Sequence, residues 1–304
     1  MIDFWQLILL GAIAGFTIFL GLPVALLQNV SSKKKGFLNA LATGILIFLI
    51  IDVFSHAWES AEDSASDAFA RKAPLNDAAF NLLALFGGLA IGLLGLVWYE
   101  SRYLNNSSSF QKSKKKNNIN DDDKVILSSS PSTFTERSSD NGEHHLHQQL
   151  LQVNAYKLAM MIAIGIGAHN FSEGLAIGQS YVTGAIGLAI ILIIGFGLHN
   201  TTEGFGIAGP LTGLIQRPKI RFLILAGLIG GGPTFIGTIV GSLWVSATAS
   251  VLFFSIAGGA LIYVSLLMYN AGRKQATNAI LMTGILVGLC AGFITDLIVT
   301  IGGA

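Results

Sequence analysis

The chain has 304 residues, of which 52% are hydrophobic and only 12% are charged, and its mean hydropathy is +0.64. These values exclude an ordinary soluble globular domain and are typical of a polytopic membrane protein. The formal net charge of +1 gives no indication of nucleic acid binding. The single cysteine, Cys290, excludes a disulfide framework and a thiolate metal site.

Eight apolar segments are long enough to cross about 30 Å of hydrocarbon as α-helices. In chain order they are residues 5–28, 37–57, 78–100, 153–179, 184–212, 220–243, 250–270 and 278–301. The first segment has neither a basic start nor a cleavage site, so we interpret it as a membrane helix and not as a signal peptide. We therefore expect an all-α polytopic membrane protein, with spans one to three in residues 1–100 and spans four to eight in residues 151–304.

The segment between the third and fourth spans, residues 101–150, is polar, and we expect it to be disordered. It ends in a histidine cluster made of His144, His145 and His147. Together with Glu143 these imidazoles could form a weak metal site. A solvated tract without bound metal is an equally good interpretation.

Basic residues are sorted to one side of the membrane. If the spans alternate in direction, all but Arg71 and Lys72 of the 18 Lys and Arg residues fall on one side. The positive-inside rule predicts that this side is the cytoplasm, so the long loop is cytoplasmic and both termini are outside. The lysine runs are best explained as topology signals that touch anionic lipid of the bilayer.

One short motif occurs twice, each time inside a long apolar run. His169-Asn170-Phe171-Ser172-Glu173-Gly174 is followed 30 residues later by His199-Asn200-Thr201-Thr202-Glu203-Gly204. In each copy the His and Glu are at i and i+4, so they share one helical face, about 6 Å apart along the axis. A turn near residues 180–184 makes the two helices antiparallel neighbours, so the two pairs can converge near mid-membrane.

Two imidazoles and two carboxylates are a suitable ligand set for a borderline divalent cation such as Zn²⁺. The alternative is a hydrogen-bonded cluster that only joins two helices, and interhelical polar pairs in membranes contribute about 0.6 kcal/mol on average. A charge at the bilayer centre costs roughly 2.5–3.5 kcal/mol, so residues such as Ser or Thr would join helices at less cost. We therefore favour a metal site at His169, Glu173, His199 and Glu203, with a proton relay as the next interpretation. Asn170 and Asn200 could either offer amide oxygens to an ion or hold the histidine rings in place.

Three further residues indicate an entrance path. Asp52 and His56 are again at i and i+4, near the outer end of the second span, and Asp296 is near the outer end of the eighth. Together they could form an acidic vestibule that concentrates cations. Capping or snorkelling at the interface explains Asp52 and His56 equally well, whereas Asp296 stands alone in an otherwise uncharged stretch.

Spans one and six also resemble each other weakly. Gly21-Leu22-Pro23 in the first and Gly231-Gly232-Pro233 in the sixth both place glycine and proline within an apolar segment. Because the two spans run in opposite directions, this similarity suggests an inverted repeat, as found in many transporters.

In these features the chain resembles the ZIP (zinc- and iron-regulated transporter-like) family of divalent metal-ion transporters. The resemblance rests on eight spans, outside termini, a His-bearing loop after span three, and the His-Asn-x-x-Glu-Gly motif in span four. It implies a 3+2+3 arrangement, in which spans 1–3 and 6–8 form inverted repeats around spans four and five, and it leaves a homodimer open. It also implies that His169, Glu173, His199 and Glu203 hold the main ion, with Asn170 and Asn200 at neighbouring second-site positions and Asp296 as an entrance carboxylate.

The chain departs from the family pattern at three positions. Family members often have an acidic residue at the position of Asn200 and a Glu at the position of Gly232, and many have a Pro where this chain has Ser172. Without those charged ligands we expect one bound ion and not two.

The sequence therefore predicts transport of a divalent transition metal into the cytoplasm across a cell membrane. Zn²⁺ is the first choice, with Fe²⁺, Mn²⁺, Co²⁺ and Cd²⁺ left open, and the ion is cargo and not a cofactor. We do not expect an enzyme. The alternatives are a membrane-embedded zinc-dependent hydrolase, although the chain has no His-Glu-x-x-His motif, and a proton-coupled carrier that binds no metal.

Overall fold

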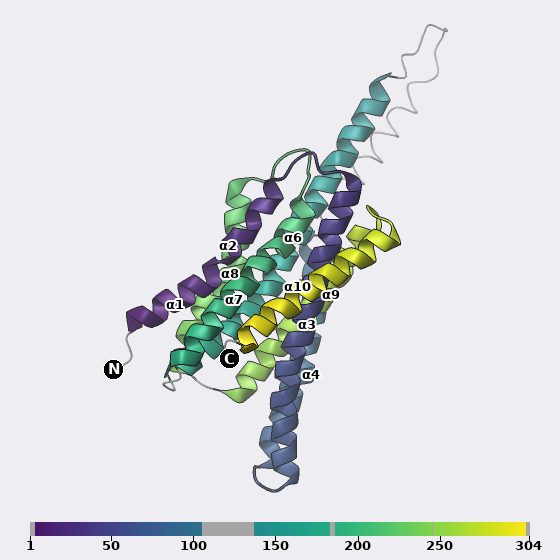
Figure 1. Cartoon of the computed structure of the whole chain (residues 1–304). Helices are drawn as coiled ribbons and strands as arrows, with labels where there is room; N and C mark the ends of the chain where they lie inside the picture. The colour runs from purple at the N-terminus through teal and green to yellow at the C-terminus, as the bar shows by residue number, and fades with distance from the viewer. Residues whose placement is uncertain (1–3, 105–136, 183–185, 245, 302–304) are drawn as a thin grey trace, which may run out of the picture.

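The residues that the structure describes, 4–104, 137–182, 186–244 and 246–301 of a computed structural model, fold into helices without any strand (Figure 1). The helices are α1 (Phe4–Phe16), α2 (Ile18–Gly21), α3 (Ser32–Phe69), α4 (Leu75–Tyr99), α6 (Arg137–Val182), α7 (Ile186–Ala208), α8 (Ile220–Leu243), α9 (Ala247–Arg273) and α10 (Asn278–Ile301). Short 3-10 turns, η1 (Leu22–Leu26) and η3 (Gly209–Leu211), follow α2 and α7. A π-helical turn, η2 (Glu100–Leu104), follows α4.

Seven helical segments within the described residues are long and apolar enough to cross a membrane. They agree with seven of the predicted spans, and α8 and α10 have the predicted bounds, 220–243 and 278–301. The second copy of the motif lies on α7, a helix of 23 residues. Some side chains of α7 lie outside the described residues. That α7 is a membrane span, the fifth of eight in chain order, therefore stays a prediction.

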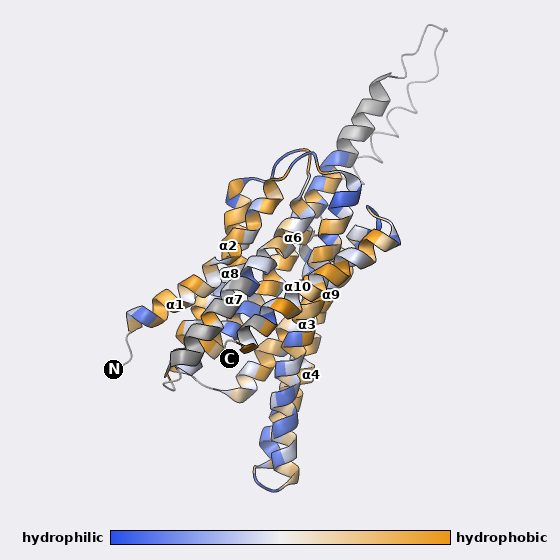
Figure 2. Ribbon diagram, viewed as in Figure 1, coloured by the Kyte–Doolittle hydropathy of each residue, from blue (hydrophilic) through white to orange (hydrophobic). Residues whose placement is uncertain are grey.

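Two helices are longer than the sequence predicts. α3 continues to Phe69, past the predicted end of the second span at residue 57. α6 begins at Arg137, so residues 137–150 are helical where we expected disorder, and residues 105–136 lie outside the described residues. Hydropathy marks the bilayer but not the helix end, because a formed helix extends readily through polar residues of good helix propensity. Figure 2 shows the hydrophilic C-terminal part of α3.

The first membrane segment is broken near its middle. α1 ends at Phe16, and the hydroxyl of Thr17 donates to the carbonyl oxygen of Ala14 at 2.7 Å. Pro23 then lies in the first turn of η1. In α8, Pro233 lies inside the helix, where it cannot donate to the carbonyl oxygen of Ile229. The two similar segments, Gly21-Leu22-Pro23 and Gly231-Gly232-Pro233, therefore both lie where the regular α-helical hydrogen bonding is interrupted.

The helices pack as two groups. In the motif group (α1, α2, α6, α7 and α8), α6 packs along α8, α7 packs on α1 and α2, and α1 packs on α8. In the support group (α3, α4, α9 and α10), α4 packs along α9, and α3 packs on α10 and α9. The two groups meet along a seam, where α6 lies against α9 and α7 lies against α3 and α10. The seam is filled by a core of buried aliphatic residues that includes Leu46, Ile162, Ile207, Leu261 and Met268.

Glycines bring backbones into contact within each group. A Cβ added to Gly174 in α6 would collide with the carbonyl oxygen of Thr234 in α8, and one added to Gly92 in α4 would collide with that of Ile256 in α9. At the seam, the atoms nearest to a Cβ on Gly165 of α6 are side-chain atoms of α9 at 3.7–3.8 Å, an ordinary van der Waals contact. Close helix approach through small residues is the main source of packing in lipid. Each group is therefore more tightly joined within itself than to the other.

Candidate metal site

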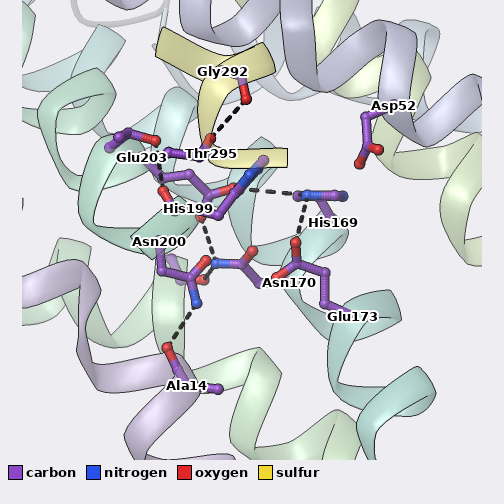
Figure 3. A network of polar contacts seen from close by, with 12 residues as sticks. Ala14, Asp52, His169, Asn170, Glu173, His199, Asn200, Glu203, Gly292 and Thr295 are labelled. Carbon is purple, nitrogen blue, oxygen red and sulfur yellow. Dashed lines mark hydrogen bonds and ion pairs between the residues drawn. The ribbon is translucent and has the colours of Figure 1, made fainter. Parts of the chain in front are cut away.

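The two motif copies meet inside the motif group. α6 carries His169 and Glu173, and α7, which runs beside it in the opposite direction, carries His199 and Glu203 (Figure 3). All four side chains are buried, and Glu203 has no exposed surface. The rings of His169 and His199 lie with their centroids 5.8 Å apart. The structure therefore brings together the four residues that the motif spacing singled out.

The donor atoms of the four side chains lie close together. The Nε2 atom of His169 lies 3.2 Å from Oε1 of Glu173 and 3.8 Å from Oε1 of Glu203, and Nε2 of His199 lies 3.7 Å from that same Glu203 oxygen. His169, Glu173 and His199 each offer a ligand atom, and these atoms lie within 4.8 Å of one another. Ligands of a tetrahedral Zn²⁺ with bonds of 2.0–2.1 Å are about 3.3 Å apart. Small movements would therefore bring these donors to binding distance.

Several of these donors have no hydrogen-bond partner among the described residues. They are Nδ1 and Nε2 of His169, Nε2 of His199, Oε2 of Glu173 and Oε1 of Glu203. Buried polar atoms are nearly always paired, and an unpaired one costs about 1–3 kcal/mol. Nε2 of His169, Nε2 of His199 and Oε1 of Glu203 are among these atoms and lie within 3.8 Å of one another along His169–Glu203–His199, so a divalent cation bound by their lone pairs would satisfy them.

A comparison with protein-family models identifies the chain. The model described as "ZIP Zinc transporter" matches residues 7–295. The chain belongs to the ZIP zinc transporter family. Members of this family are transporters of zinc and other divalent metals and not enzymes, so the chain is a multi-pass membrane protein of divalent metal transport. A comparison with curated proteins found no match.

In this ZIP protein the two motif asparagines have different partners. The amide nitrogen of Asn170 donates to Oε2 of Glu203 at 2.8 Å and to the carbonyl oxygen of Gly230 in α8 at 2.9 Å. The amide nitrogen of Asn200 donates to the carbonyl oxygen of Ala14 in α1 at 2.8 Å. Asn170 therefore orients a site carboxylate directly, whereas Asn200 joins α7 to α1.

The two backbone carbonyls are the part of the site that the sequence did not reveal. Neither Ala14 nor Gly230 has a side chain that attracts attention. The signal that could have found them is the irregularity near each one, namely the break after α1 at Thr17 and the proline inside α8 at Pro233. A further contact that the motif did not predict is the ring of Phe48 in α3, whose centroid lies 5.7 Å from that of His199.

The three residues that the sequence predicts to line an entrance, Asp52, His56 and Asp296, lie near one another on the support group. Nε2 of His56 lies 3.7 Å from Oδ1 of Asp52, and the two side chains are 58% and 22% exposed. The His56 ring stacks on Phe254 with centroids 5.5 Å apart. Asp296, half-buried in α10, interacts electrostatically with Asp52 and His56.

Asp52 also lies within electrostatic reach of the buried cluster. Its charge acts on His169, Glu173 and Glu203, and Figure 3 shows its carboxylate near the His169 ring. Since Asp52 is partly exposed, negative charge extends from the protein surface to the buried donors. By contrast, the side chains of His144, His145 and His147 lie outside the described residues.

Proposed function

We propose that this ZIP protein transports Zn²⁺ into the cytoplasm and that His169, Glu173, His199 and Glu203 bind the ion during transport. The observation that carries the proposal is the spacing of the buried donors, 3.2–3.8 Å between nitrogen and oxygen atoms that largely lack other partners. Two neutral imidazoles and two carboxylates balance the 2+ charge and give a tetrahedral N₂O₂ set, which suits Zn²⁺.

We propose an eight-span topology in which α7 is the fifth span and both termini lie outside. The position of the basic residues supports this orientation. A 3+2+3 arrangement with inverted repeats accounts for the packing pattern: α4 on α9 has its counterpart in α10 on α3, and α6 on α8 has its counterpart in α7 on α1 and α2. Under this symmetry the Asn170–Gly230 contact corresponds to the Asn200–Ala14 contact.

In this mechanism the ion enters past Asp296, Asp52 and His56. It then exchanges its water shell for the four buried donors. The route to the cytoplasm is closed by the seam, where side chains such as Leu46, Leu261 and Met268 are fully buried. The ion is released when the motif group moves against the support group, because the seam is joined by side-chain contacts, whereas glycine–backbone contacts hold each group together. α6 and α7 therefore move with α1, α2 and α8 and not by themselves.

Ion uptake into vesicles tests this function. Purified protein in liposomes that contain a zinc-sensitive dye should take up Zn²⁺. An excess of Fe²⁺, Mn²⁺, Co²⁺ or Cd²⁺ outside should lower the rate of Zn²⁺ uptake in proportion to the affinity of each ion for the same site. Glu203→Gln, which keeps the shape of the side chain and removes its charge, should reduce uptake at least tenfold. Ser255→Ala, which removes a buried hydroxyl between α4 and α9, should leave uptake unchanged. Full uptake by Glu203→Gln would refute the proposed site.

A further inference from the structure

Another buried oxygen without a hydrogen-bond partner among the described residues lies at the seam, away from the four-residue cluster. It belongs to Asn39 of α3, a residue that is 3% exposed. In the sequence, Asn39 follows shortly after Lys33, Lys34 and Lys35. Phe48, which contacts His199, is nine residues further along the same helix. At 1.5 Å per residue, Asn39 therefore lies about 14 Å from the level of the cluster, toward the basic side.

The side-chain amide of Asn39 is hydrogen-bonded to Gln275, which lies between α9 and α10 of the support group. Its nitrogen donates to Oε1 of Gln275 at 3.1 Å, and the backbone oxygen of Gln275 accepts from the hydroxyl of Ser32 at 3.1 Å. The hydroxyl of Thr43 donates to the backbone oxygen of Asn39 at 2.8 Å. These contacts fix the side chain but leave its Oδ1 atom without a hydrogen-bond partner among the residues that the structure covers.

Oδ1 of Asn39 points across the seam at the end of α7. It lies 3.5 Å from the position of a Cβ on Gly209, the residue that follows the last residue of α7. Here α7 continues into η3, and the carbonyl oxygens of Ala208 and Gly209 both accept hydrogen bonds from Thr212. Oδ1 of Asn39 is thus a buried oxygen at this place that has lone pairs left for a cation.

Between the cluster and Asn39 the seam is apolar. Leu46 lies on the same face of α3 as Asn39, and it is fully buried, as is Met268 of α9. Thr43, the polar residue between them, already donates its hydroxyl to a backbone oxygen. A cation that leaves the cluster toward the basic side would thus meet the Asn39 oxygen only after an apolar stretch.

We propose that Oδ1 of Asn39 is a transient ligand for the divalent cation on its way to the cytoplasm, after the seam opens. This inference rests on the proposed transport function. A neutral amide oxygen is a weaker ligand for a divalent transition metal than imidazole or carboxylate, so it can replace part of the water shell without retaining the ion. Gln275 acts as the positioning residue that keeps the oxygen turned to the seam.

Rate and binding measurements on full-length protein separate this role from a structural one. Asn39→Leu, which is similar in size but lacks the oxygen, should lower the maximal Zn²⁺ uptake rate into liposomes about tenfold. The equilibrium Kd for Zn²⁺ at the four-residue cluster should stay within about twofold of the wild-type value, since Asn39 is distant from it. Ser255→Ala, which also removes a buried unpaired oxygen but inside the support group, should change neither quantity.

Asn39→Asp provides the second readout, because a carboxylate in the same shape binds Zn²⁺ more tightly. This variant should bind a second, weaker equivalent of Zn²⁺ in detergent and transport more slowly than wild type. The inference is overturned if Asn39→Leu transports at the wild-type rate, or loses equilibrium Zn²⁺ binding together with transport. If Asn39→Leu does not fold, a single equivalent bound by Asn39→Asp overturns it. A wild-type protein without uptake would instead refute the transport function itself.

Discussion

Replacing the two motif asparagines by alanine should have unequal effects on ion binding. Asn170→Ala removes the hydrogen bond to Oε2 of Glu203, at 2.8 Å, and leaves the Gly230 carbonyl without its donor. A hydrogen bond to a charged group contributes about 1.5–3 kcal/mol, and residues that orient metal ligands change affinity about 10–100-fold. We therefore expect the Kd for Zn²⁺ to rise about 10–100-fold.

Asn200→Ala is the matched control. It removes the same side chain at the equivalent motif position, but the lost hydrogen bond, at 2.8 Å, goes to the backbone oxygen of Ala14 and not to a site carboxylate. Its loss should cost about 1 kcal/mol of folding free energy and change the Kd less than about threefold. Titration of purified protein with Zn²⁺ against a competing chelator measures both constants, and thermal unfolding in the same detergent measures stability. Equal weakening by the two variants, or an unchanged Kd for Asn170→Ala, would refute the assignment of Asn170 as the residue that orients Glu203.

Three further predictions follow from the site and the packing. Zn²⁺ uptake should fall as the pH is lowered from about 7.5 to about 5, because protons compete with the ion for imidazole and carboxylate; a flat profile would contradict binding by these groups. Gly174→Ala should destabilise the protein by about 1–3 kcal/mol in thermal unfolding, whereas Gly87→Ala, where a Cβ would meet open space, should not; equal melting temperatures would count against the close α6–α8 contact. Cysteines at Gly165 and Ala260, in a Cys290→Ser background, have Cβ positions 3.8 Å apart across the seam and suit a disulfide. Oxidation should abolish uptake and reduction should restore it, whereas transport by the oxidised protein would exclude movement of the two groups against each other.

The membrane segments could be predicted largely from hydropathy. α8 and α10 begin and end at the predicted residues, because polar or helix-breaking residues such as Pro218 and Thr277 lie just outside them. The ends of α3 and α6 could not be predicted in the same way. Their polar extensions are compatible with helix as well as with loop, and the packing around them decides.

The buried cluster was predictable because two constraints coincide. The i, i+4 spacing places His169 with Glu173 and His199 with Glu203, and the short connection between the helices sets the pairs against each other. The partners of the asparagines were not predictable, since they are backbone oxygens of helices distant in sequence. The pairs of glycine and facing backbone were not predictable either, because they are known only from the three-dimensional packing. This packing joins α6 and α7 to α1, α2 and α8.

The metal content of the purified protein tests the central claim most directly. Wild-type protein and a His169→Ala/His199→Ala double variant should be purified identically, equilibrated with Zn²⁺, desalted, and analysed for bound metal by mass spectrometry. We predict about one zinc ion per chain in the wild type and close to none in the variant, because a tetrahedral site that loses two of its four ligands no longer retains the ion. Stoichiometric zinc retained by the folded double variant would show that the ion binds elsewhere and would contradict the account.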